Sequence, residues 1–239
     1  MRALLLPIKD LRNAKQRLSG ALTRGERLAL AQAMFRDTIA AVSNVRRADK
    51  VFVVTNYRPA MLTAEEHGWE VLREERQISE SVSVDTASRQ CVERGATAVL
   101  RLPLDLPLVR PEDIDELLSI ECSPPGMVIV PSRDGTGTNA ILRTPPTLFP
   151  SHFGPGSFVK HRHEGQGAGA QIVVCRNARL EMDVDDEADL LALLQHDLHG
   201  THTGQWLGKS GVAERLLGTD RQVPPQRGKE RASERTIGI

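Results

Sequence analysis

The sequence of 239 residues has few aromatic side chains, few cysteines and no excess of either charge. Aromatic residues make up 3% of the chain, and 31 basic side chains balance 31 acidic ones. These figures argue against a base-stacking surface and against a groove that attracts nucleic acid through bulk positive charge. The three cysteines include no Cys-x-x-Cys pair, which is typical of ordinary thiols in a reducing compartment.

Long hydrophobic runs are also missing. No run approaches the ~18 consecutive apolar residues that suggest a membrane-spanning helix. The N-terminal run meets charged residues too early to resemble a signal peptide. We therefore expect a cytoplasmic protein that has neither a membrane nor a nucleic acid as its partner.

Short apolar runs alternate with amphipathic segments along most of the chain, which predicts buried strands alternating with helices. We expect strands at 2–8, 51–55, 70–72, 96–102, 127–130, 140–142, 171–175 and 180–182. We expect helices at 24–43, 61–67, 83–94 and 111–120, with further helices starting at 157 and 185. Thr23 and Glu26 fit a capping box at the start of the first helix. The order indicates an α/β fold with a mostly parallel sheet and helices on both faces.

The chain is predicted to form one domain over residues 1–217. No internal repeat is present, and the length and apolar fraction suit a single core. From about Gly218 the composition becomes charged, contains proline and lacks an apolar face. We expect 218–239 to be a disordered tail.

A cationic loop follows the first expected strand. Lys9, Arg12, Lys15 and Arg17 fall within nine positions. In an open α/β sheet, ligands bind beyond the carboxyl ends of the strands, and clustered cations suit a polyphosphate. A solvated basic loop with no ligand is the alternative interpretation.

Three carboxylates are placed to meet a metal ion. Asp105 follows the fourth strand between apolar residues, where an unpaired charge would be costly to bury. Asp183 and Asp185 are two positions apart, so an extended segment turns both to one side. Such hard oxygen ligands favour Mg²⁺. Alternatively, Asp185 is an N-cap of the helix that follows it.

Two glycine-rich loops suit an anion. The loop 133–139 combines glycine with hydroxyl and amide side chains, and 153–158 places Ser157 at an expected helix start. A plain N-cap role for Ser157 is equally compatible. Two groups of histidines at 161–163 and 196–202 have no neighbouring cysteine and no His-Glu-x-x-His motif, which does not favour zinc.

Taken together, these segments resemble the CofC family, the guanylyltransferases that use 2-phospho-L-lactate or phosphoenolpyruvate in coenzyme F-420 biosynthesis. The resemblance extends to about Leu194. Its motifs, in the family's order, are Pro7-Ile8-Lys9, Ala14-Lys15-x-Arg17-Leu18, Asp105-Leu106-Pro107-Leu108, Asp134-Gly135-Thr136-Gly137-Thr138-Asn139, Phe153-Gly154-Pro155-Gly156-Ser157-Phe158 and Asp183-Val184-Asp185.

The resemblance implies a GT-A-like (Rossmann-like) nucleotidyltransferase fold. It also implies that Asp105, Asp183 and Asp185 hold Mg²⁺. It assigns the carboxylate and phosphate of the small acid to Lys9, Thr138, Gly154 and Ser157. It assigns the GTP phosphates to Lys15 and Arg17, which together with Asp105 form the expected catalytic group.

One segment departs from the family pattern. Many relatives have Gly-Leu-Asn after the third strand, whereas this chain has Ser79 to Asp85 with neither Gly nor Asn. Two interpretations are open. Either Ser81, Ser83 or Asp85 makes the contacts that Gly and Asn make in those relatives, or this chain selects a different nucleotide or acid. We take Ser83 as the candidate nucleotide-binding residue of this segment.

The resemblance implies guanylyl transfer from GTP to phosphoenolpyruvate or 2-phospho-L-lactate, with release of pyrophosphate. The sequence leaves 3-phosphoglycerate open as the acceptor. It also leaves open another Mg²⁺-dependent nucleotidyltransferase or sugar-nucleotide transferase of the same fold, and a non-catalytic nucleotide-binding protein. A homodimer is a further expectation, as is delivery of the product to a downstream transferase.

Overall fold

The structure, a computed structural model, describes residues 1–74, 76 and 78–219. Its strands are β1 (Arg2–Pro7), β2 (Lys50–Thr55), β3 (Glu70–Arg73), β4 (Ala98–Arg101), β5 (Gly126–Pro131), β6 (Thr138–Thr144) and β7 (Gln171–Val174). Its α-helices are α1 (Arg24–Val42), α2 (Arg58–Glu66), α3 (Glu80–Glu93), α4 (Pro111–Ser119), α5 (Ser157–Gly167), α6 (Glu187–Leu193), α7 (His202–Ser210) and α8 (Val212–Thr219). Two short 3-10 helices, Leu11–Asn13 and Gln16–Gly20, lie between β1 and α1.

The strands form one sheet in the order β3-β2-β1-β4-β6-β5-β7. All neighbouring strands are parallel except β6, which is antiparallel to both β4 and β5. The mostly parallel α/β sheet predicted from the sequence is confirmed. The reversal of β6 follows from the short loop 132–137 that joins it to β5, since a parallel connection needs a much longer crossover.

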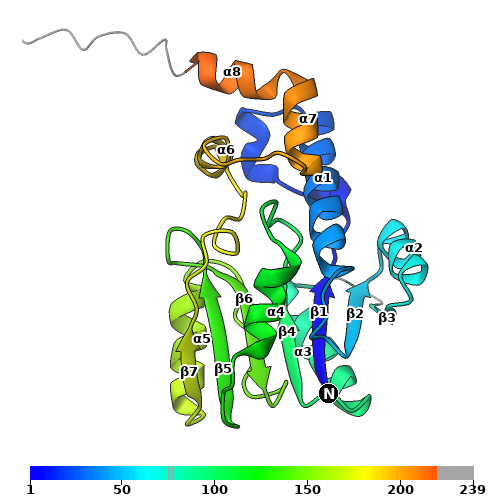
Figure 1. The fold of residues 1–239 in the computed structure, drawn as a ribbon, viewed down its shortest axis with the longest axis vertical. Helices are drawn as coiled ribbons and strands as arrows, with labels where there is room; N and C mark the ends of the chain where they lie inside the picture. The colour runs from blue at the N-terminus through cyan, green and yellow to red at the C-terminus, as the bar shows by residue number, and fades with distance from the viewer. Residues whose placement is uncertain (75, 77, 220–239) are drawn as a thin grey trace, which may run out of the picture.

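Helices cover both faces of the sheet (Figure 1). One face packs apolar residues of α1, α2 and α4 against β1, β4 and β5. The other face packs α3 and α5 against alternate residues of the same strands. Strands buried on both faces require continuous apolar runs, and this requirement explains why those runs predicted the strands well.

A second apolar core lies beyond the carboxyl ends of the strands. It joins the N-terminal half of α1 to α6, α7 and α8, which lie above the sheet in Figure 1. Asp37 of α1 ties α7 to this core, because its buried carboxylate accepts hydrogen bonds from the backbone N–H groups of His202 and Thr203. The sequence analysis did not predict α7 or α8.

Most predicted elements are confirmed, including the capping box of Thr23 and Glu26 at the start of α1. The strand expected at 180–182 is wrong. The side chain of Asn177 accepts the N–H groups of Arg179 and Leu180, so the chain forms a turn there. Short apolar runs do not distinguish such a buried turn from a strand.

The helix start predicted at Asp185 is also wrong. Asp186 is the N-cap of α6, and its carboxylate accepts the N–H of Asp189 at 3.1 Å. At the other end of the domain, α8 continues to Thr219, two residues past the predicted boundary. The rest of the predicted tail, 220–239, lies outside the described residues. In the part that is described, no helix is long and apolar enough to cross a membrane.

Candidate active site

A cavity of about 930 Å³ opens at the carboxyl ends of the parallel strands. Nine of the ten predicted site residues line it, and these are Lys9, Lys15, Arg17, Asp105, Thr138, Gly154, Ser157, Asp183 and Asp185. The tenth, Ser83, does not. Its buried hydroxyl donates to the carbonyl of Ser79 within α3.

The reversed strand β6 brings its first residues, rather than its last, to this edge of the sheet. Thr138 begins β6, so it lies beside residues that follow the ends of the parallel strands, such as Asp105 after β4. The rule that ligands meet the residues after each strand therefore needs the strand direction, which the sequence alone did not supply.

Lys15 is at the centre of an ion-pair cluster. Its ammonium nitrogen lies 2.7 Å from Asp105 Oδ2 and 3.0 Å from Asp185 Oδ1, and the lysine side chain is only 8% exposed. Burial lowers the pKa of Lys15, but Asp105 and Asp185 raise it more, so the pKa lies above its usual value. Arg17, which is largely exposed, pairs with the other oxygen of Asp185 at 2.6 Å.

The backbone of Lys15 explains how the side chain reaches the cluster. Its φ of 56° and ψ of 40° lie in the left-handed region, and it is the one non-glycine residue in the described chain with positive φ. Such a conformation costs about 1–2 kcal/mol for an ordinary residue. The buried ion pairs with Asp105 and Asp185 offset part of that cost, because they require the side chain to turn inward.

The pKa values of Asp183 and Asp185 are shifted in opposite directions, although the two residues are only two positions apart. Burial raises the pKa of Asp183 to about 6, with Asp105 adding repulsion, while a hydrogen bond from Asn139 opposes the rise. For Asp185 burial also raises the pKa, but Lys15 and Arg17 lower it more, so its net pKa is below the usual value. Asp183 is thus the carboxylate whose charge is least compensated.

Asn139 was missed as a site residue, although it belongs to a predicted motif. Its amide nitrogen donates to Asp183 Oδ1 at 3.2 Å and to the carbonyl of Leu180 at 3.0 Å. These two bonds hold the segment after β7 against the start of β6. Asn139 therefore orients Asp183 within the cavity.

The loop between β5 and β6 is fixed by Asp134. One of its oxygens accepts the Ser132 hydroxyl at 2.5 Å and the Thr136 N–H at 2.9 Å. These bonds lower the pKa of Asp134 to about 2. Gly137 cannot be replaced easily, since an added Cβ would lie 2.8 Å from Ser132 Oγ. The loop is a built structure that aims Thr138, rather than a loose turn.

The second glycine-rich loop leads into α5. Gly154 and Gly156 have φ values of 113° and 71°, which L side chains rarely adopt. Gly156, rather than Ser157, is the N-cap of α5, and no side chain caps the helix. The plain N-cap interpretation of Ser157 is therefore wrong, and its buried hydroxyl lies in the cavity wall.

The atypical segment after β3 contributes differently from what we expected. The Ser81 hydroxyl accepts the N–H of Phe153, and the Asp85 carboxylate accepts the N–H of Ser151. Both residues thus hold the loop before α5. Of the described residues of this segment, Glu80 lines the cavity. Its carboxylate pairs with the nearly buried Arg101 of β4.

Arg101 was not predicted as a site residue. Its guanidinium donates to the carbonyl of Asn139 at 3.0 Å and lies 4.2 Å from the ring centre of Phe153. Its Nε is buried without a hydrogen-bond partner. The signal that could have revealed it is a single charge in the otherwise apolar run 96–102, since a buried strand charge requires partners.

The carboxylates fit Mg²⁺ in chemistry, although they are not arranged to hold it as they stand. In residues 1–74, 76 and 78–219, no three His, Cys, Asp or Glu side chains converge to form a ready metal site. Two of the three predicted ligands, Asp105 and Asp185, are paired with Lys15. The hard oxygen donors and the poorly compensated charge of Asp183 favour a hard cation.

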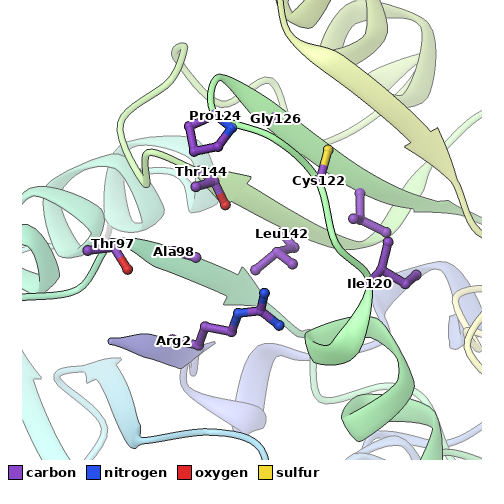
Figure 2. Close-up of a pocket in the computed structure, with 10 residues that line it drawn as sticks. Arg2, Thr97, Ala98, Ile120, Cys122, Pro124, Gly126, Leu142 and Thr144 are labelled. Carbon is purple, nitrogen blue, oxygen red and sulfur yellow. The ribbon is translucent and has the colours of Figure 1, made fainter.

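A smaller cavity of about 210 Å³ lies at the opposite end of the sheet (Figure 2). Figure 2 shows Arg2 extending from β1 into this space, near Ile120 and Cys122. The Arg2 guanidinium donates to the carbonyl of Leu118. None of the predicted site residues lines this cavity, so the larger cavity is the candidate active site.

Comparisons with known sequences place the chain in a family. A profile of the family described as "Guanylyl transferase CofC like" matches residues 1–222. The phosphoenolpyruvate guanylyltransferase of Conexibacter woesei is 33% identical over 217 residues, covering 90% of this chain and 96% of that protein. The 2-phospho-L-lactate guanylyltransferase of Methanothermobacter thermautotrophicus is 29% identical, covering 95% of both chains.

Solved structures agree with the fold. A candidate nucleotide-diphospho-sugar transferase from Desulfovibrio desulfuricans G20 matches with a TM-score of 0.67 at 15% identity, covering 92% of this chain and 95% of that one. A nucleotidyl transferase from Methanothermobacter thermautotrophicus matches with a TM-score of 0.55 at 14% identity, covering 82% of this chain and 97% of that one. The predicted nucleotidyltransferase-like fold is thus confirmed.

Proposed function

The chain belongs to the CofC family of guanylyl transferases, and on that premise we propose that it joins GTP to phosphoenolpyruvate or 2-phospho-L-lactate. The products are a diphosphate-linked guanosine adduct and pyrophosphate, in coenzyme F-420 biosynthesis. The observation that carries the proposal is the single cavity in which the cationic loop, three carboxylates and two glycine-rich loops meet. The relatives named for the two acids support both as candidate acceptors.

On this proposal, the predicted residues that line the cavity fall into two groups, one for each substrate. We call Lys15, Arg17, Asp105, Asp183 and Asp185 the phosphate side. We call Lys9, Thr138, Gly154 and Ser157 the acid side. On this proposal the phosphate side meets the triphosphate of GTP, and the acid side holds the carboxylate and phosphate of the small acid.

The reaction needs positioning and charge compensation more than proton transfer. A phosphate oxygen of the acid is already anionic near neutral pH, so it attacks the α-phosphorus of GTP without a general base. A new P–O bond forms as the bond from the α-phosphorus to the bridging oxygen of the β-phosphate breaks, and pyrophosphate leaves. Lys15 and Arg17 reduce the repulsion between the two polyanions and stabilise the charge that grows on pyrophosphate.

Asp105, Asp183 and Asp185 would hold Mg²⁺. The ion supplies charge neutralisation and orientation of phosphate oxygens when it is bound. Because Lys15 shares Asp105 and Asp185, these carboxylates would give up an ion pair with the Lys15 ammonium in order to hold the ion. The Lys15 ammonium would then be available to a phosphate oxygen of GTP.

The test is pyrophosphate release from the purified protein with GTP and Mg²⁺. Phosphoenolpyruvate, 2-phospho-L-lactate and 3-phosphoglycerate are offered separately, with ATP in place of GTP as the nucleotide control. We expect release with GTP and one of the first two acids. Release with 3-phosphoglycerate alone would assign a different acceptor. Release with a sugar phosphate and none of the three acids would contradict the proposal and favour a sugar-nucleotide transferase.

A cytoplasmic location, a homodimer and delivery of the product to a downstream transferase belong to the same proposal. Sedimentation velocity tests the dimer directly. We expect a single species at twice the mass of the chain, and a monomer at micromolar concentration would remove that part of the proposal without affecting the activity.

A further inference from the structure

We propose that His161 is a positioning residue that fixes the hydroxyl of Thr138 as a hydrogen-bond donor toward the acid substrate. The inference rests on the proposed function, because that function places the acid beside Thr138. It adds a residue that touches no substrate and lies behind the cavity wall.

The first nitrogen of the ring can only be an acceptor. His161 lies on α5 and is 1% exposed. Its Nε2 lies 2.9 Å from the backbone nitrogen of His152, which carries an N–H and donates it. A backbone N–H cannot accept a hydrogen bond, so Nε2 carries no proton in this arrangement.

The second nitrogen must then carry the proton. Burial lowers the pKa of His161 to about 3, with the nearby Arg143 and Arg101 adding repulsion, so the ring is neutral near pH 7. A neutral imidazole has one N–H, and with Nε2 excluded this N–H is on Nδ1. Nδ1 lies 3.0 Å from Oγ1 of Thr138 and donates to it.

The direction of this bond decides the role of Thr138. Because Thr138 Oγ1 accepts a hydrogen bond from the Nδ1–H of His161, the hydroxyl hydrogen of Thr138 needs a different acceptor. Thr138 lines the cavity at the start of β6, so that acceptor comes from a ligand. A carboxylate or phosphate oxygen accepts such a bond, whereas an ammonium group does not.

Packing keeps the ring in this orientation. The Phe153 ring stands edge-on to the imidazole, with ring centres 5.0 Å apart, and the Phe149 ring is tilted by 33° to it, with ring centres 6.1 Å apart. A flip of the ring would place carbon atoms against the His152 N–H and the Thr138 hydroxyl and leave both without their partner. A buried polar group without a partner is unfavourable, so the observed orientation is held from two sides.

The tautomer can be measured without any substrate. The full-length protein is labelled with ¹⁵N in its histidines, and long-range proton–nitrogen correlations identify the protonated ring nitrogen of His161. We expect a neutral ring protonated on Nδ1. A ring protonated on Nε2, or a cationic ring near pH 7, would overturn the proposal whatever the enzyme's activity.

The functional test compares His161→Phe, His161→Asn and Thr138→Val. Phenylalanine keeps the ring volume without nitrogen, whereas the amide nitrogen of asparagine lies near the position of Nδ1 and can still donate. We expect His161→Phe and Thr138→Val each to raise the KM for the acid about tenfold, as for a lost charge-assisted hydrogen bond. We expect the KM for GTP to change less than about twofold, and asparagine to recover most of the loss.

The double variant His161→Phe with Thr138→Val separates positioning from general structure. If His161 acts through Thr138, the double variant is no worse than the worse single variant. If the double variant instead raised the KM for the acid by the product of the two single effects, the proposal would be overturned. An equal rise in the KM for the acid and the KM for GTP would overturn it as well. His163→Phe, an exposed histidine on the same helix, is the matched control and keeps wild-type values. A wild-type protein inactive with every acid would instead overturn the proposed function, and the tautomer would still be measurable.

Discussion

The two sides of the cavity hold their polar groups in different ways. On the acid side, hydrogen bonds within the loops and glycine conformations fix the groups, as in the loop ordered by the Asp134 carboxylate and the bond from His161 to Thr138. On the phosphate side, opposite charges hold one another, with Lys15 between Asp105 and Asp185. The acid side is ready for a ligand, whereas the phosphate side has to exchange internal ion pairs for ligand contacts.

This difference indicates how the two substrates are bound. A preformed set of donors loses little free energy to ordering when a small acid binds, which suits a ligand with few contacts. In the cluster on the phosphate side, the charges of Lys15 and its carboxylates neutralise one another. These ion pairs open only for a highly charged ligand that offers replacement partners, such as GTP with a divalent cation. We therefore expect substitutions on the phosphate side to affect turnover and those on the acid side to affect the KM for the acid.

The largest effect is expected from Asp183→Asn. The substitution removes the least compensated carboxylate, and we expect kcat/KM to fall by more than about 100-fold. Without Mg²⁺ the variant should be more stable near pH 7 by about 1–2 kcal/mol, because a buried carboxylate with a raised pKa opposes folding when ionised. Pyrophosphate release and thermal unfolding measure the two effects. A fully active variant would remove Asp183 from the site.

The next largest effect is expected from Lys15→Met. The change keeps much of the side-chain volume but leaves Asp105 without its buried partner, and we expect kcat to fall about 30-fold or more. The KM for the acid should change little. Arg12→Gln, an exposed cation of the same loop paired with Asp10, is the matched control and should stay within about twofold. An equal loss of kcat in the two variants would mean that turnover depends on the total charge of the loop and not on the buried ion pairs of Lys15.

A drop in pH should affect the phosphate side first. Asp183 has a pKa raised to about 6, so its protonation below that pH weakens cation binding. We expect kcat/KM to fall about tenfold between about pH 7.5 and about pH 5, and excess Mg²⁺ to restore part of it. His161, with a pKa lowered to about 3, stays neutral over this range. A loss that excess Mg²⁺ does not relieve would point away from Asp183.

The raised pKa of Asp183 affects stability in the opposite direction to activity, because a drop in pH should lower activity but increase stability. Its pKa in the folded protein lies above the ordinary value of 3.8, so the folded protein binds more protons than the unfolded chain between about pH 4 and about pH 6. The contribution of this group to stability therefore increases as pH falls through that window. Thermal unfolding of wild type and Asp183→Asn without Mg²⁺ should show the difference between them shrinking toward pH 4.

A smaller effect is expected from Gly137→Ala on the acid side. The added Cβ would lie 2.8 Å from Ser132 Oγ, which holds the loop through Asp134. We expect stability to fall by about 1–2 kcal/mol and the KM for the acid to rise severalfold. Gly135→Ala is not a matched control, because Gly135 has positive φ, so Gly25→Ala with open space around it serves instead. An unchanged KM for the acid would mean that the loop does not position Thr138.

The smallest effect is expected from Ser83→Ala. We proposed Ser83 from the sequence as a nucleotide-binding residue, but its hydroxyl donates to the Ser79 carbonyl inside α3. We expect the KM for GTP to change less than about twofold. Glu80→Gln, in the same segment but on the cavity wall, is the informative comparison. A large change in Ser83→Ala would restore the prediction from sequence and show that α3 moves when GTP binds.

The sequence was most informative where a local rule decides the structure. Seven of the eight strands predicted from apolar runs are confirmed, because the sheet is buried on both faces. The capping box of Thr23 and Glu26 predicted the start of α1 correctly. The predictions at 180–182 and at Asp185 are wrong, because the side chains of Asn177 and Asp186 determine a turn and a helix cap there. Those side-chain bonds compete with the local pattern, and nothing in the pattern shows which one prevails.

What the sequence determined by itself is the set of chemical groups and the elements that carry them. The sequence placed Lys15 in a cationic loop after the first strand and Asp105 after the fourth, and glycines marked both anion loops. The tertiary structure decided which groups meet. It reversed β6 so that Thr138 faces the cavity, paired Lys15 with carboxylates 90 and 170 residues away, and buried His161 behind Thr138. These contacts arise from long-range packing, because hydrogen-bond partners so far apart in sequence leave no local pattern.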